Sequence, residues 1–157
     1  MSSGLPWPSR VMAVNYRVFR ALRHRHAMSA AQRSAIRGDL GQLRGFRQAV
    51  LCTQTSDGRW IPTPVNIAVD GSRILFRAEP RSLKVRRLSR RPEVKLFAST
   101  FRGKPRGPVL AGTATTLEGA DALEAIDLVA KAWRWDMGVV ERGFDRIGVP
   151  ETYVQVR

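Results

Sequence analysis

The sequence predicts a mainly β protein with some α, built as an antiparallel β-barrel with flanking helices. Apolar residues recur at every second position in short runs from Arg47 onward, as in half-buried strands. Tight turns such as 56–59 join consecutive runs, and short connections favour antiparallel pairing. Helical periodicity is confined to segments before, between and after these runs. We therefore expect a small barrel with helices on its outside.

The expected strands follow the runs and turns in order. A strand over 48–55 returns, after a turn at Asp57-Gly58, as a strand over 60–69. Pro62 and Pro64 cannot donate to a ladder, so this part is predicted to be an edge, a bulge or a ligand-facing stretch. Further strands are expected over 73–78, 93–100, 109–117 and 152–157, the last with Val154 and Val156 facing inward.

Helices are expected at both ends and in the middle of the chain. An N-terminal amphipathic helix over 11–28 has an apolar stripe opposite its arginines, and a second piece covers 29–43, interrupted near Gly38 and Gly41. A short helix over 82–91 has Ser82 as its N-cap and Pro92 as its stop.

A later helix is predicted to begin with a capping box at Asp121-Ala122-Leu123-Glu124. Its spacing predicts a buried stripe of Leu123, Ile126, Val129 or Ala130, and Trp133. One more helix is expected over 140–147. Residues 1–46 are thus interpreted as a basic helical leader and 47–157 as the barrel domain.

The formal net charge of +14 is concentrated in two blocks. Residues 1–47 hold nine arginines and one acid, for +8, and residues 81–106 hold ten Lys or Arg and one acid, for +9. Such an excess is typical of proteins that bind nucleic acid or another anionic ligand. The sequence lacks helix-turn-helix spacing, zinc ligands and an RNA-binding aromatic signature, so no specific nucleic-acid partner is expected.

Cysteine usage and hydropathy bear on location. A single cysteine, Cys52, cannot form an internal disulfide, which fits a reducing, cytoplasmic compartment. No apolar run approaches the roughly 18–20 residues of a membrane span. The basic amphipathic helix is predicted to pack on the domain or on a dimer partner, and the second interpretation is peripheral contact with an anionic membrane.

The run from Phe76 to Pro92 carries the candidate chemistry. A strand leads through a short loop into a helix whose first turn holds a hydroxyl and cations. Ser82, Lys84 and Arg81 are suited to give charge-assisted hydrogen bonds to a phosphate. The alternative is a solvated basic helix face.

Residues 47 to about 117 resemble the pyridoxamine 5′-phosphate oxidase-like, split β-barrel superfamily, whose fold is the FMN-binding split barrel. The resemblance is strongest to its coenzyme F420-dependent, deazaflavin branch. The motifs that carry it, in order, are Ala49–Thr53, Asp57-Gly58-Arg59, Thr63-Pro64-Val65, Val69-Asp70-Gly71, Ile74–Arg77, Ser82-x-Lys84-Val85-x-Arg87-Leu88-x-x-x-Pro92, Gly107-Pro108 and Gly112-Thr113-Ala114.

The resemblance implies a homodimer with flavin-like cofactors in grooves at the subunit interface. Ser82 and Lys84 would hold the cofactor phosphate, helped by Arg87. Ring contacts would come from Thr63, Pro64, Val65 and Asn66, and Arg77 and Ala78 would flank the ribityl chain. The family often has an aromatic residue in place of Asn66 and a Thr in place of Ala78.

The implied activity is an oxidoreductase that transfers a hydride between the deazaflavin of F420 and an electron-poor small molecule. No catalytic side chain is assigned, because the cofactor supplies the reactivity. FMN is the rival cofactor. The alternative is an FMN-dependent enzyme, or a non-catalytic flavin- or haem-binding protein of the same fold.

Overall fold

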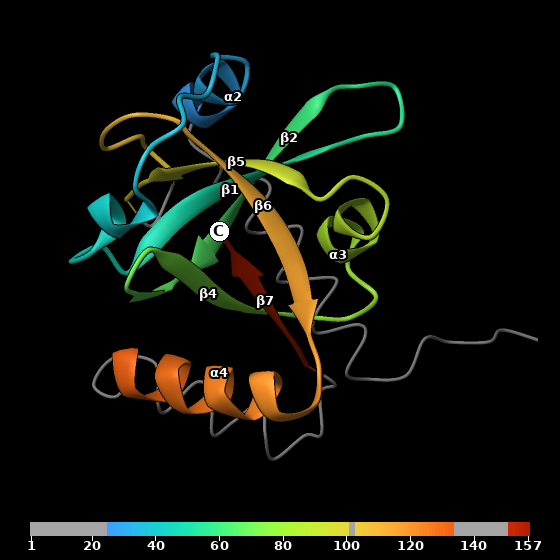
Figure 1. The fold of residues 1–157 in the computed structure, drawn as a ribbon. Coiled ribbons are helices and arrows are strands. Elements are labelled where there is room, and N and C mark those ends of the chain that lie inside the picture. The colour runs from blue at the N-terminus through green and yellow to red at the C-terminus, as the bar shows by residue number, and fades with distance from the viewer. Residues whose placement is uncertain (1–24, 101–102, 134–150) are drawn as a thin grey trace, which may run out of the picture.

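Seven antiparallel strands form one curled sheet in a computed structural model that describes residues 25–100, 103–133 and 151–157 (Figure 1). The strand order in the sheet is β2-β1-β5-β6-β7-β4-β3. The strands are β1 (Gln48–Gln54), β2 (Trp60–Asn66), β3 (Ala68–Asp70), β4 (Arg73–Ala78), β5 (Glu93–Ala98), β6 (Leu110–Leu117) and β7 (Thr152–Val156). The described helices are α2 (Arg25–Ala31), α3 (Leu83–Leu88), α4 (Gly119–Ala132) and the 3-10 turn η1 (Leu40–Leu43).

The long strand β6 belongs to both halves of the barrel. Its first part pairs with β5, from Leu96↔Leu110 to Glu93↔Thr113, and its second part pairs with β7, starting at Ala114↔Val156. Gly112 lies just before this change of partner, and a Cβ there would stand 2.5 Å from Val156 Cγ1. Only glycine therefore fits at this position without a shift of the neighbouring strand.

The predicted strand over 60–69 is two strands with a corner at Ile67. The backbone N–H of Ile67 donates to Arg47 O at 2.9 Å, and its carbonyl accepts from Trp133 Nε1 at 3.1 Å. Because β2 and β3 lie at opposite ends of the strand order, this corner carries the chain from one sheet edge to the other. The corner closes the barrel.

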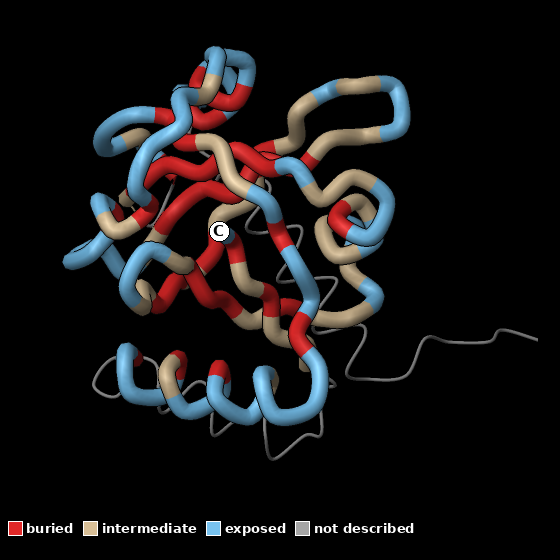
Figure 2. Tube along the Cα trace, viewed as in Figure 1, coloured by how far each residue is buried: buried red, intermediate tan, exposed pale blue. Residues whose placement is uncertain are grey.

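Alternate residues of the strands face the barrel interior and the covering helices. Ala49 and Leu51 of β1 belong to the interior core, whereas Val50 and Cys52 face α2. On the other half, Leu75 of β4 packs against α4. Figure 2 shows the buried residues concentrated in the strands and in one side of each helix. The mainly β, antiparallel split-barrel prediction is confirmed.

Several predictions about the helices need correction. Residues 34–39 are not helical, because Ile36 forms an isolated bridge with Leu110 and its N–H donates to Val109 O. The helix predicted over 29–43 is therefore reduced to the end of α2 and to η1. The residues 1–24, which hold most of the predicted N-terminal helix, and 134–150, which hold the helix predicted over 140–147, lie outside the described residues.

The helix α4 also differs from its prediction. It begins at Gly119 rather than at the Asp121 capping box, and its N-cap Glu118 makes no side-chain cap hydrogen bond. Leu123 and Ile126 are exposed, whereas Ala125 joins Val129 and Trp133 in the buried cluster. The buried face of α4 therefore runs through the small Ala125 rather than through the larger Leu123 and Ile126.

Candidate functional site

The short helix α3 follows β4 and covers one end of the barrel. Ser82 is its N-cap, as predicted, and Ser82 Oγ accepts from Val85 N at 3.4 Å. Leu88 is buried in the interior core, and Val85 packs against the same core. These two apolar residues hold α3 against the barrel and leave its polar side chains at the rim.

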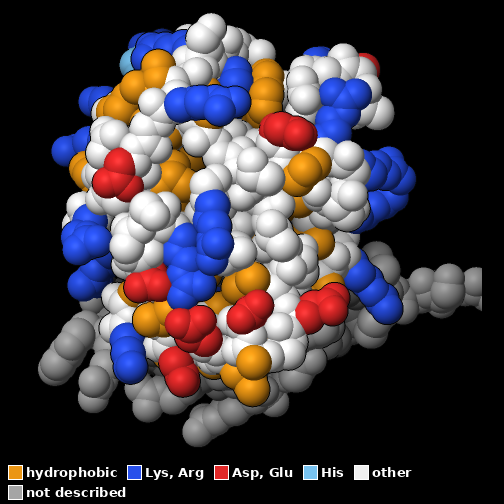
Figure 3. Space-filling model, in the orientation of Figure 1, with side chains coloured by type: hydrophobic (Ala, Val, Ile, Leu, Met, Phe, Trp, Pro, Cys, Tyr) orange, Lys and Arg blue, Asp and Glu red, His pale blue; other side chains and the backbone are white. Residues whose placement is uncertain are grey.

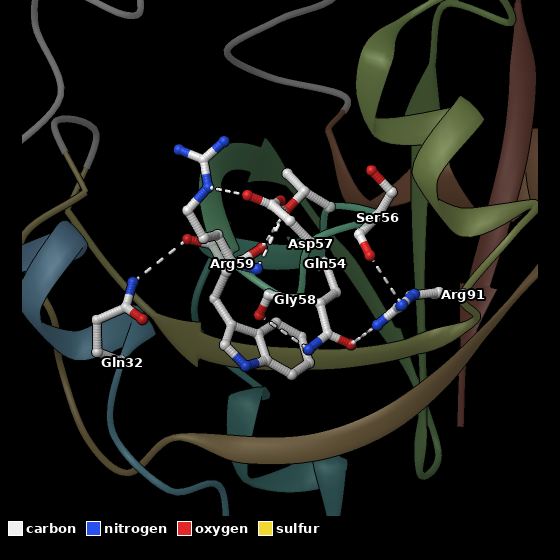
Figure 4. A network of polar contacts seen from close by, with 9 residues as sticks. Gln32, Gln54, Ser56, Asp57, Gly58, Arg59 and Arg91 are labelled. Carbon is white, nitrogen blue, oxygen red and sulfur yellow. Dashed lines mark hydrogen bonds and ion pairs between the residues drawn. The ribbon is translucent and has the colours of Figure 1, made fainter.

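Two arginines one helical turn apart tether α3 to β1 and its hairpin. Arg87 Nη1 donates to Oγ1 of the buried Thr53 at 3.2 Å. Arg91 Nη1 donates to Gln54 Oε1, and Arg91 Nη2 to Ser56 O, both at 3.1 Å (Figure 4). Thr53 and Arg91 are contacts that the sequence analysis missed, although the i, i+4 spacing of Arg87 and Arg91 was visible.

The hairpin that Arg91 reaches has the predicted Asp-Gly turn. Gly58 adopts a φ of +87°, and Asp57 accepts from Arg59 Nε at 2.8 Å and from the hydroxyl of Thr55. Gln54 Nε2 donates to Gly58 O at 3.0 Å (Figure 4). The turn is thus stiffened by side chains at its base, which keeps the β1–β2 register in place beside α3.

Lys84 is a half-buried cation at this rim, whereas Arg81 and Arg86 are exposed. Its side chain is half-buried, and no hydrogen bond or ion pair joins its ammonium to the described part of the chain. Burial lowers the pKa of Lys84 to about 8, and the carboxylate of Glu79 partly opposes this effect. A desolvated ammonium without a partner is stabilised by any anion that approaches it.

Glu79 is a second feature that the sequence analysis missed. It opens the turn before α3, and Glu79 Oε1 accepts from Arg81 N at 3.0 Å. Arg81 follows Glu79 by two positions, and its side chain is exposed. A carboxylate in the turn opposes anion binding there, so Lys84 and Arg87 rather than the turn backbone are the suitable anion contacts.

Arg77 and Ala78 close β4 just before this turn. Arg77 Nη1 forms an ion pair with Glu151 Oε1 at 2.8 Å, so its guanidinium serves a structural contact next to β7. Ala78 is buried in the interior core. The ion pair with Glu151 was not visible in the sequence, because 74 positions separate the two residues.

The strand β2 is the edge of the sheet, as one of the predictions for Pro62 and Pro64 required. Ile67 N donates to Arg47 O, and Thr55 N to Arg59 O. Odd-numbered residues of β2 therefore bond β1, and even-numbered residues turn their backbone groups away from it. The two prolines stand where an N–H would point away from β1, on the side where no described strand pairs with β2, so this side offers carbonyls but no donors at 62 and 64.

The four β2 residues predicted to line a cofactor ring are divided between two faces. Thr63 and Val65 lie opposite Leu51 and Ala49, which face the interior, whereas Pro64 and Asn66 lie on the outer face. Asn66 pairs with Gln48 at the end of β1 far from α3. At about 3.4 Å per residue it lies roughly 17 Å along the strand from Ile61.

Only some of the predicted site residues therefore lie at the same end of the barrel. Ala78, the 81–87 turn and the start of β2 all border the end that α3 covers, since Ile61 pairs with Thr53. Two shallow clefts lie elsewhere, one beside α2 and one between Gly38–Leu40 and Asp70–Arg73. None of the predicted site residues lines either cleft.

Comparison with known proteins finds neighbours among solved structures. HutZ, the haem storage protein from Vibrio cholerae, superposes with a TM-score of 0.55 at 11% identity, covering 73% of this chain and 82% of its own. An F420-H2 dependent reductase gives 0.53 at 11%, covering 71% and 94%. A candidate pyridoxamine 5′-phosphate oxidase from Listeria innocua gives 0.53 at 14%, covering 75% and 88%.

The chain has the pyridoxamine 5′-phosphate oxidase-like split β-barrel fold. Neither a protein-family model nor a curated protein matches the sequence. Identities this low show the fold and not the branch, and the neighbours of this split barrel include proteins described as reducing with F420, as binding FAD and as storing haem. None of the helices in the described segments is long and apolar enough to cross a membrane.

Proposed function

We propose that this split-barrel protein is a coenzyme F420-dependent oxidoreductase that acts as a homodimer on an electron-poor small molecule. The phosphate of the cofactor would be held at the 82–87 turn, by Lys84 with help from Arg87. The observation that carries this proposal is the half-buried ammonium of Lys84 at the rim of the barrel, to which no described residue gives a hydrogen bond or ion pair. A phosphate next to it would stabilise the protonated amine and raise its pKa toward the ordinary value.

Arg87 supports the proposal through its position. One of its nitrogens is bonded to Thr53, which orients the guanidinium at the rim, and a guanidinium carries further N–H donors. Ser82 contributes less than the sequence suggested, because its Oγ already accepts from Val85 N. We assign Lys84 the main charge, Arg87 a directed donor, and Arg81 an outer, exposed cation.

The edge of β2 fits a flat, hydrogen-bonding ring. The carbonyls of Pro62 and Pro64 turn away from β1, and no N–H accompanies them. A ring N–H would find acceptors there, and the prolines keep another strand from occupying the edge. Thr63 and Val65 face the interior and bond β1 through their backbone, so they would hold Pro62 and Pro64 in place, while Asn66 would contribute at the far end.

When bound, reduced F420 supplies a hydride from its deazaflavin ring. The residues of this chain bind the phosphate, orient the ring along the edge of β2 and exclude water with the apolar residues of the barrel rim. No side chain of the described segments is assigned to proton transfer. The pair formed by Arg77 and Glu151 would fix the end of β4 beside the cofactor rather than contact it.

Fluorescence titration of the purified protein with F420, FMN and haem tests the proposal first. We expect quenching of F420 in the micromolar range or better, with weaker binding of FMN. Oxidation of reduced F420 should then accelerate when an electron-poor acceptor is added. Tight binding without turnover on a broad acceptor panel would favour a non-catalytic binder, and preference for FMN or haem would reject the F420 assignment.

A further inference from the structure

The two basic blocks of the sequence meet at a cleft beside α2. His26 and Arg33 come from the first block and Lys104 from the second, and together with Pro105 and Gly107 they line a cleft of about 400 Å³. No Asp or Glu is among these lining residues. This cleft lies on the outer face that α2 covers, whereas α3 stands apart from α2 in Figure 1.

Lys95 fixes the backbone that carries Arg33. Lys95 Nζ donates to Ala31 O at 3.0 Å and to Arg33 O at 2.7 Å, and it lies 4.4 Å from the centre of the Trp60 ring. The carbonyls at the end of α2 are thereby satisfied by a buried cation. Arg33 follows directly from this anchored end, so its starting point on the cleft wall is set by the core.

The backbone at Lys104 is anchored as well. Thr100 N donates to Lys104 O at 3.0 Å, and Lys104 N donates to Thr100 Oγ1 at 3.1 Å. Arg106 N donates to Ala98 O at 2.7 Å, which ties the following residues to the end of β5. The two cations that line the cleft, Arg33 and Lys104, therefore start from backbone that is held in place.

A buried hydroxyl next to the cleft lacks a partner. Ser99 is 7% exposed, and its Oγ has no hydrogen-bond partner. Among the buried side-chain nitrogen and oxygen atoms of the described segments, all others have a partner. Ser99 forms an isolated bridge with Pro105, a residue of the cleft wall. An unsatisfied buried hydroxyl costs stability, and no described residue satisfies this one beside the cleft wall.

We propose that this cleft binds a polyvalent oxyanion of the phosphate or carboxylate class, at a site separate from the 82–87 turn and beyond the proposed function. Cations held near one another without an acid repel, and a bound anion relieves that repulsion. Figure 3 shows Lys and Arg side chains around the pale blue histidine at the upper edge, while Asp and Glu gather toward α4. The cleft, at about 400 Å³, has room for such an anion.

Isothermal titration calorimetry tests the proposal. It measures the affinity of the full chain for pyrophosphate and for citrate at physiological ionic strength. We expect one site, with affinity reduced at least tenfold in Arg33→Ala/Lys104→Ala. The charge-preserving Arg33→Lys/Lys104→Arg variant should stay within about threefold of the wild type. The matched control Arg37→Ala/Lys131→Ala removes one Arg and one Lys outside the cleft and should change affinity less than twofold.

Equal loss in the cleft variant and the control would overturn the proposal, because binding would then report overall charge. Absence of saturable binding in the wild type would also overturn it, as would tighter binding of an oligonucleotide than of pyrophosphate. F420 titration of the same variants is a separate readout. A cleft variant that loses pyrophosphate but keeps F420 binding separates this site from the proposed cofactor site.

Discussion

The guanidinium of Arg87 donates to the buried hydroxyl of Thr53 at 3.2 Å, and this contact joins α3 to the interior side of β1. The two residues are 34 positions apart, yet they set where the basic helix stands over the barrel end. The same arginine is suited to a phosphate because only part of its donor set is used. Arg87 thus has a structural contact with Thr53 and, in the proposed function, further donors for the phosphate.

Replacing Thr53 with Val should lower the free energy of unfolding by about 1.5–3 kcal/mol, since one side chain–side chain hydrogen bond to a charged group is lost. The valine fills nearly the same volume, so packing is retained. Urea denaturation measures the change, and Thr113→Val, at an exposed position of β6, is the matched control. Equal stability of Thr53→Val and the wild type would show that the Arg87 contact contributes nothing.

The affinity for F420 should depend on pH through Lys84. Its pKa of about 8 means that the amine is protonated below pH 8 and increasingly neutral above it. A phosphate prefers the protonated form, so affinity should be full at pH 7 and fall up to tenfold per pH unit above 8. The Lys84→Arg variant should show a flat profile over pH 7–9, and the same slope in both proteins would contradict this role.

Gly112→Ala should destabilise the protein by about 1–3 kcal/mol, the usual cost of overpacking a well-packed position. The added Cβ would stand 2.5 Å from Val156 Cγ1, where β6 changes partners. Thermal unfolding followed by circular dichroism measures the change. Thr113→Ala is the neighbouring control, and an unaltered midpoint for Gly112→Ala would mean that β6 and β7 are packed less tightly than described.

Restoring donors to the open edge should promote self-association. In Pro62→Thr/Pro64→Thr, two N–H groups would point away from β1, and an unprotected edge pairs with other strands. Light scattering against concentration should show larger species in this variant than in the wild type. If its mass distribution matches the wild type, the prolines do not protect the edge.

Much of the barrel was predictable because its signals are local. The Asp57-Gly58 turn, the Ser82 N-cap and the inward Val154 and Val156 each depend on a few neighbouring residues, and all are confirmed. The corner at Ile67 was not predictable, since it depends on Arg47 and Trp133 from distant elements.

The helices and the site were less predictable for the same reason. Leu123 and Ile126 have helical spacing, but tertiary contact selects Ala125 for burial. Ser82, Lys84 and Arg87 were visible as a motif, whereas Thr53, Glu79 and Glu151 matter only through the fold. The meeting of the two basic blocks beside α2 likewise had no signal in the sequence.

The most direct test of the proposed cofactor site is the dissociation constant of F420 for Lys84→Ala compared with Arg86→Ala. Arg86 is exposed on the same helix, so both variants lose one positive charge from α3. We predict at least a tenfold loss of affinity for Lys84→Ala, less than a twofold change for Arg86→Ala, and nearly unchanged thermal stability for both. Equal F420 affinity in Lys84→Ala and the wild type would contradict a phosphate site at this turn.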